Sequence, residues 1–195
     1  MRKVFGIAAA MLVTSTMAPA QAQPVAAVAL RAMGHDCQMP YTQVDKRISA
    51  CTQLIRAAFN SPQTTAVFHL FRGRAYADKG DTQNALADFT ATISTLPDLP
   101  EAYADAAGVL AREGKNDEAS SDFERAGFFF LKKGHCSKAV PAYGEALKIN
   151  PKLAAALYGR GLCERQNGNA TAAQADLAAA LAADPAIATK INWPS

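Results

Sequence analysis

The sequence predicts an all-α protein built from stacked helical repeats, and three observations lead to this fold class. The chain has 195 residues, and most of its length carries an internal period of 34 residues. Glycine and proline recur at fixed places in that period, where helices are expected to stop. A segment ahead of the repeats has apolar residues at helical spacing. We therefore expect a solenoid in which each unit stacks on the next.

The first 22 residues are predicted to be a signal peptide. Positive residues 2–3 precede an apolar stretch over 4–13, which is too short to span a bilayer. Residues 20–22 (Ala-Gln-Ala) match a cleavage pattern, so the mature chain is expected to begin at Gln23 in the periplasm or outside the cell. A buried N-terminal helix is the alternative. No membrane contact is expected after cleavage.

Residues 23–63 are predicted to form a helical segment ahead of the repeats. Pro24, an apolar run and then Gly34 have the signature of a short helix. A second helix is expected over residues 44–59, with its apolar residues on one face.

Four sets of residues mark the repeat. The first two sets are Gly73, Tyr76, Gly80, Ala85, Phe89, Pro97 and Ala107, Leu110, Gly114, Ala119, Phe123, Leu131. The last two sets are Gly127, Phe130, Gly134, Ala139, Tyr143, Pro151 and Gly161, Glu164, Gly168, Ala173, Leu177, Pro185. The second and third sets are offset by about 20 residues, while the other steps are 34.

This pattern resembles the tetratricopeptide repeat (TPR), a 34-residue helix-turn-helix unit, over about residues 64–187. The resemblance implies a right-handed solenoid of helical hairpins, followed by a tail at residues 188–195. Its units would span residues 66–99, 100–133, 120–153 and 154–187.

Small residues are expected where the two helices of a unit approach closely. Gly73 and Gly161 would face Ala85 and Ala173. The glycines that follow each first helix tolerate a left-handed conformation, and the bulky residues of the second helix fill the space towards the next unit. These glycines are Gly80, Gly114, Gly134 and Gly168, and the bulky residues are Phe89, Phe123, Tyr143 and Leu177.

The short step makes residues 117–133 serve as the second helix of one unit and the first helix of the next. Losing one helix reverses the direction of everything after it, which predicts a kink or break in the superhelix. The alternative is one long helix. The same segment contains the run 128–131 (Phe-Phe-Phe-Leu), which is either buried on several sides or partly a partner site.

The resemblance also implies a partner site, because in TPR proteins the first helices line a concave groove that binds peptides or partner helices. Mixed charge with aromatic residues suits a peptide ligand. A solvated helix face is the alternative. The carried-over positions chosen as partner-binding are Arg74, Asp105, Arg112, Phe128, Lys132, Tyr158 and Arg165. Other groove positions are Val67, Leu70, Leu131 and Leu162. The first unit is apolar at several of its groove positions, which predicts that the helix over 44–59 packs there.

Neither catalytic residues nor a cofactor or metal site are predicted. His35 lies near Cys37 and His135 precedes Cys136, but the usual zinc-ligand spacings do not occur. In an oxidising compartment these cysteines are better candidates for disulfides. The protein is therefore not expected to be an enzyme.

Two disulfides are predicted. Cys37 and Cys51 flank a short turn, in a segment similar to one found ahead of the repeats in some exported alphaproteobacterial TPR proteins. Cys136 begins one helix and Cys163 ends the next, so antiparallel packing brings them to the same end of the solenoid. Two free, buried cysteines are the alternative for this second pair.

The net charge of +3, from 20 Lys and Arg against 17 Asp and Glu, gives no strongly basic surface for nucleic acid. We therefore expect an exported scaffold whose partner is a protein or peptide. The rival interpretations are a small periplasmic enzyme or ligand-binding protein on a helical scaffold, and a purely structural envelope component.

Processing provides the first test. N-terminal sequencing of the protein recovered from its native host should return Gln23, because the Ala-Gln-Ala pattern at residues 20–22 directs cleavage after Ala22. Recovery of Met1 from the soluble cytosol would contradict both the processing and the export of the protein.

Overall fold

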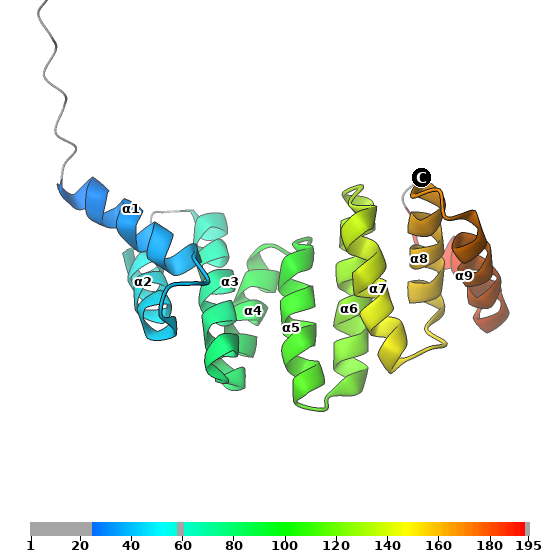
Figure 1. Cartoon of the computed structure of the whole chain (residues 1–195), viewed down its shortest axis with the longest axis horizontal. Helices are drawn as coiled ribbons and strands as arrows, with labels where there is room; N and C mark the ends of the chain where they lie inside the picture. The colour runs from blue at the N-terminus through cyan, green and yellow to red at the C-terminus, as the bar shows by residue number, and fades with distance from the viewer. Residues whose placement is uncertain (1–24, 58–60, 194–195) are drawn as a thin grey trace, which may run out of the picture.

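The computed structural model describes residues 25–57 and 61–193, and this part of the chain is a row of ten α-helices without a strand (Figure 1). The signal peptide and the new N-terminus expected at Gln23 lie outside the described residues. The helices are α1 (Val25–Gln38), α2 (Val44–Ala57), α3 (Pro62–Lys79), α4 (Thr82–Thr95), α5 (Pro100–Arg112), α6 (Asn116–Lys132), α7 (Cys136–Ile149), α8 (Ala154–Gln166), α9 (Ala170–Ala183) and α10 (Ile187–Lys190). None of the described helices combines the length and apolarity needed to cross a bilayer.

The two N-terminal helices form the expected segment ahead of the repeats. Helix α1 runs through Gly34 to Gln38, so the prediction that Gly34 ends this helix is wrong. Glycine is tolerated inside a helix at a cost of about 1 kcal/mol. The chain turns instead at Pro40, which disfavours a helical conformation at the residue before it.

Helix α2 packs on α3 and covers the first repeat, as predicted. The Cys37–Cys51 disulfide joins α1 to α2 with a Cα–Cα distance of 4.9 Å, and Phe71 of α3 packs against the cluster around it. Ion pairs link α2 to the end of α3: buried Arg47 lies 2.5 Å from Asp78. The N-terminal segment is therefore a packed cap on the array.

The repeat glycines have the conformations that the period predicts. Gly80, Gly114, Gly134 and Gly168 have φ values of 82°, 74°, 74° and 83°, the left-handed region that glycine enters without strain. Inside the helices, a Cβ added at Gly73 would fall 2.7 Å from the ring of Phe89. The closest neighbour of Gly73 is thus Phe89, and not Ala85 as predicted.

Helix α6 is one continuous helix with two partners, in agreement with the single-helix alternative. It packs about as extensively against α5 as against α7. Gly127 faces Tyr143 of α7 in the way that Gly73 faces Phe89. Ala119, in the first turn of α6, is fully buried. Thus α6 is the second helix of one hairpin and the first helix of the next.

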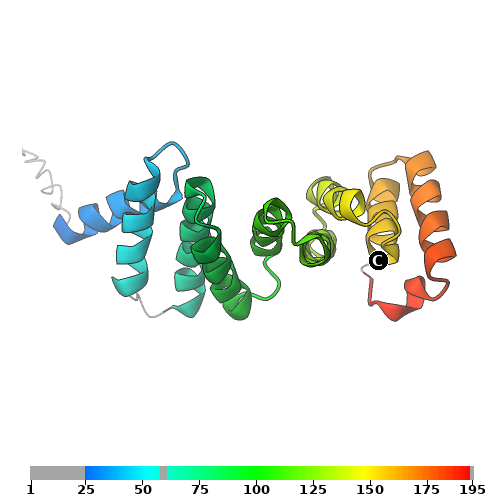
Figure 2. The ribbon, with the colours of Figure 1, turned by 90° about the horizontal axis from the view of Figure 1, so that it is seen from below.

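This shared helix switches the inner face of the array. The inner helices of an array are those that contact the next inner helix along it. In the first half these are α3 and α5, and in the second half they are α6 and α8. By contrast, α4 lies further from α6, and α5 lies further from α7. Helix α6 is therefore an outer helix of the first half and an inner helix of the second. Figure 2 shows α5 and α6 nearly end-on in the middle of the array, between helices that lie closer to the plane of view.

The second predicted disulfide lies in the second half. Cys136 at the start of α7 is joined to Cys163 near the end of α8, with Cα atoms 5.0 Å apart. The two helices run antiparallel, and this brings the residues together across 27 positions of sequence.

The contact between α6 and α7 is tested by adding a single methyl group. We expect Gly127→Ala to lower the free energy of unfolding by about 1–3 kcal/mol, because the new Cβ would fall 2.6 Å from the ring of Tyr143. Gly144→Ala, in the neighbouring helix, is the control. A Cβ there meets nothing within 4 Å, so it should raise stability by about 0.5–1 kcal/mol. Equal effects in urea unfolding would contradict the packing of α6 on α7.

Candidate functional site

The seven predicted partner-binding residues fall into two groups on opposite faces. Arg74, Asp105 and Arg112 belong to α3 and α5, the inner helices of the first half. The α6/α8 face, which we define by Phe128, Lys132, Tyr158 and Arg165, belongs to the inner helices of the second half. Because α6 changes sides, the single continuous groove implied by the regular repeat is divided in two.

In the first group, the opposite charges are paired with each other. Arg74 Nε lies 2.5 Å from Asp105 Oδ2, which links α3 to α5. Burial raises the pKa of Asp105, while the charge and hydrogen bond of Arg74 oppose that shift. A peptide that used either charge would have to compete with this internal ion pair.

The exposed cations also divide between two ends of the array. Lys132 and Arg165 are in the last turns of α6 and α8, which run in the same direction. Arg112 is in the last turn of α5, which is antiparallel to α6 and ends on the opposite side (Figure 1). Lys132 and Arg165 therefore lie at the same end of the inner helices, and Arg112 lies at the other end.

Aromatic side chains give the second half a cavity. The rings of Phe129 and Tyr103 stack with centroids 5.5 Å apart, and Phe128 meets Phe129 edge-on at 5.5 Å. A cavity of about 360 Å³ lies between α5 and α6. It is lined by Pro97, Tyr103, Glu124, Arg125, Phe128, Phe129 and Ile191.

The wall of this cavity carries one carboxylate with a shifted pKa. Burial raises the pKa of Glu124, and the neighbouring positive charge of Arg125 opposes it. The Tyr103 hydroxyl donates a hydrogen bond to the carbonyl of Pro97, 3.0 Å away, and this fixes one side of the wall.

The apolar run at residues 128–131 is divided between the two roles that the sequence left open. Phe130 and Leu131 are buried in the main core. Phe128 and Phe129 are only partly buried and contribute to the cavity. The predicted groove positions Leu70 and Leu162 are also core residues, because they point between helices and not into the groove.

The C-terminal tail covers the two aromatic residues of the α6/α8 face. Trp193 meets the ring of Phe128 at 5.8 Å and that of Tyr158 at 5.2 Å. Its indole nitrogen donates a hydrogen bond to the carbonyl of Ile187, 3.1 Å away. The repeat pattern ends before this segment and gave no signal for it.

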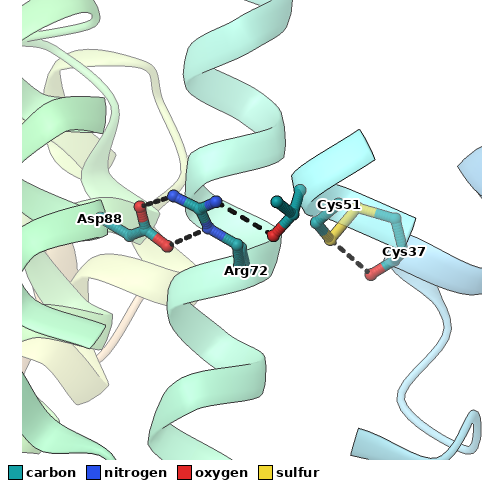
Figure 3. Close-up of a disulfide and its surroundings, with 5 residues drawn as sticks. Cys37, Cys51, Arg72 and Asp88 are labelled. Atoms are coloured by element: carbon teal, nitrogen blue, oxygen red, sulfur yellow. Dashed lines mark hydrogen bonds and ion pairs between the residues drawn. A yellow bond between two sulfur atoms is a disulfide. The ribbon is translucent and has the colours of Figure 1, made fainter. Parts of the chain in front are cut away.

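A charge network around the buried Asp88, at the opposite end of the array, includes the one histidine–carboxylate contact of the described residues. His69 Nδ1 lies 2.7 Å from Asp88. Arg72 contacts both Asp88 oxygens at 2.8 Å (Figure 3). Arg72 also donates to Thr52 of α2, beside the Cys37–Cys51 disulfide. The dashed contact from Cys51 to the Cys37 carbonyl is no hydrogen bond, because a disulfide sulfur carries no proton.

This network holds helices together. Burial acts to raise the pKa of Asp88, but the hydrogen bonds and positive charge of Arg72 and His69 outweigh it and hold that pKa below its ordinary range. Arg72 thereby fastens α2 and α4 to α3. The Asp88 carboxylate accepts from Arg72 and contacts His69 at the same time, so we assign it a structural role.

The last repeat contains the same device. Arg160 donates two hydrogen bonds of 2.7 Å to Asp176, at the repeat positions of Arg72 and Asp88. Sequence reasoning missed both pairs, although an Arg–Asp spacing of 16 residues recurring in the first and last units was available as a signal.

The described residues do not support a metal centre. Within residues 25–57 and 61–193, no three His, Cys, Asp or Glu side chains are placed to hold an ion together. Cys37 and Cys136, the two thiols considered as ligands, are in disulfides.

A model of the tetratricopeptide repeat family matches residues 70–127 and 130–186, more than half of the chain. No curated protein matches the chain significantly.

Several solved structures show a weaker likeness. A crystal structure of MamA protein is 19% identical, covers 86% of this chain and 97% of its own, and has a TM-score of 0.43. MamA from Desulfovibrio magneticus RS-1 is 14% identical, with 85% and 97% coverage and a TM-score of 0.42. YrrB, described as a TPR protein with an unusual peptide-binding site, is 21% identical, with 70% and 75% coverage and a TM-score of 0.37.

The network around Asp88 predicts a pH-dependent loss of stability. Asp88→Asn should cost about 3 kcal/mol near neutral pH, because it removes a buried carboxylate and leaves the partly buried Arg72 with a weaker partner. Since the folded-state pKa is depressed, this contribution is present above the ordinary value of 3.8 and is lost as pH falls below it.

Urea unfolding of both proteins between pH 7 and pH 3 measures this difference. Asp45→Asn, which removes an exposed partner of Lys79, is the control and should cost less than about 1 kcal/mol. A difference between wild type and Asp88→Asn that stays constant down to pH 3 would contradict the assignment.

Proposed function

Because the chain belongs to the tetratricopeptide repeat family, we propose that it is an exported scaffold that binds a peptide or helical segment of a partner protein. TPR units are typically interaction modules without catalytic activity. The α6/α8 face is the proposed binding surface, and a protein or peptide is the proposed partner.

The cavity beside this face is the observation that carries the proposal. A partly open space of about 360 Å³ lined by Tyr103, Phe128 and Phe129 offers an apolar side chain a place to bind. Lys132 and Arg165 lie exposed at one end of the same inner helices, where they can meet carboxylates of a partner. Large aromatic anchors with a charged rim are typical of peptide-binding surfaces.

The two disulfides support the proposed export. Both bonds would be at risk of reduction in a bacterial cytosol, whereas an oxidising compartment maintains them. Together with the signal-peptide pattern, they favour a periplasmic or secreted protein.

The first half of the array has a different part in this proposal. Arg74 and Asp105 are paired with each other and the N-terminal cap packs on α3, so we assign the first half a supporting role. The rival enzymatic function would need a nucleophile beside His69. In the pocket that His69 lines, the hydroxyl closest to it in the sequence is that of Thr65, which donates a hydrogen bond to the carbonyl of Ser61, 3.2 Å away.

Site-specific photo-crosslinking in the periplasm tests the proposal. A photoreactive residue at Arg165, on α8, should capture a partner, whereas one at Lys148, exposed on the outer helix α7, should not. Capture from both positions, or from neither, would favour the structural-component alternative.

The captured partner then allows a quantitative test. Tyr158→Ala should weaken its binding at least tenfold, about 1.4 kcal/mol, because an aromatic anchor is lost. Lys148→Ala, on the outer helix α7, is the matched control and should leave the affinity unchanged. Binding that resists both substitutions would place the partner elsewhere on the protein.

A further inference from the structure

The C-terminal tail is a repeat unit that stops after one helical turn. Helix α10 occupies the repeat position at which α8 begins 34 residues earlier, but it ends at Lys190. Ile191 is extended, with φ −120° and ψ 138°. Pro194 follows Trp193 in the sequence and disfavours a helical conformation there. The chain therefore leaves the helical path at residues 191–193.

The tail lies on the surface proposed to bind the partner. Ile191 lines the cavity next to Phe128 and Phe129, and Trp193 packs on Phe128 and Tyr158. Helix α10, from which these residues continue, packs on α8, and the ribbon shows the two close together (Figures 1 and 2). One aliphatic residue and an aromatic residue two positions later thus occupy the α6/α8 face together.

We propose that residues 191–193 stand in for the partner: the α6/α8 face binds a peptide with a large aromatic residue two positions after an aliphatic one, and the tail competes with it. This inference rests on the proposed function and specifies its ligand. The Trp193 amide donates a hydrogen bond to the Ile191 carbonyl, 2.9 Å away, so the chain turns at Asn192 while both side chains reach this face.

Competition follows from the attachment of the tail to the protein. A short tether gives its end an effective concentration on the order of 1 mM. A tail whose own affinity is about 100 µM would then weaken a competing peptide roughly tenfold. Removing the indole should therefore increase the affinity for an added peptide.

A synthetic peptide with the sequence of residues 187–195, in which phenylalanine replaces the tryptophan, is the probe. With a fluorescein label, it should bind the full chain carrying Trp193→Ala at least tenfold more tightly than the wild type, as measured by fluorescence anisotropy. Phe128→Ala in the same background should abolish this gain. Tyr41→Ala, a highly exposed position on the N-terminal segment, is the control and should change nothing.

The wild-type protein provides a direct readout of displacement. Trp193 is the only tryptophan of the chain, and the probe contains none, so tryptophan emission reports the tail alone. Saturating unlabelled probe should shift this emission to longer wavelength as the indole leaves Phe128 and Tyr158 for water. This measurement stands even if Trp193→Ala impairs folding.

Three results would overturn the proposal: equal affinity of wild type and Trp193→Ala, an unchanged emission while the probe is bound, or no binding to either protein at millimolar concentration. Its failure is distinct from failure of the proposed function. A partner crosslinked at Arg165 that binds wild type and Trp193→Ala equally would leave the scaffold function intact and remove the competing tail.

Discussion

The packing of Tyr143 between two glycines is the contact on which the second half of the array depends. A side chain at Gly127 of α6 or at Gly159 of α8 would occupy the space of the Tyr143 ring. The tyrosine is fully buried, and burial raises its pKa far above the ordinary value. One aromatic residue of α7 therefore determines how closely both inner helices approach.

Sharing α6 between two hairpins has a consequence for function. An ordinary array keeps its first helices on one side, but here α6 is outer to α3 and α5 and inner to α8. Aromatic groove residues collect on the second half, and the paired charges Arg74 and Asp105 on the first. Disulfides stabilise the contact of α1 with α2 and that of α7 with α8. In the chain-entropy model, closing loops of 14 and 27 residues contributes about 3–3.5 kcal/mol each.

The sequence was most informative where a residue type answers a strict local demand. The sequence predicted the left-handed glycines after the first helices and both cysteine pairs, because backbone conformation and helix direction leave few choices there. It also predicted α2, which begins at Val44 as expected and is described up to Ala57. Gly34 misled because glycine alone does not end a helix. The short repeat step indicated that residues 117–133 are shared between two units, whereas the position of Trp193 depends on how helices pack in three dimensions, and no local pattern reports that.

The central claim is that α6 belongs to both halves, and hydrogen exchange measured against increasing urea tests it most directly. If α6 completes the hairpins with α5 and with α7, its amides should open only together with those of both neighbours and at the highest free energy in the chain. The denaturant dependence of α5, α6 and α7 should then merge into one isotherm. Opening of α7, α8 and α9 while α6 stays protected with α5 would contradict the shared helix.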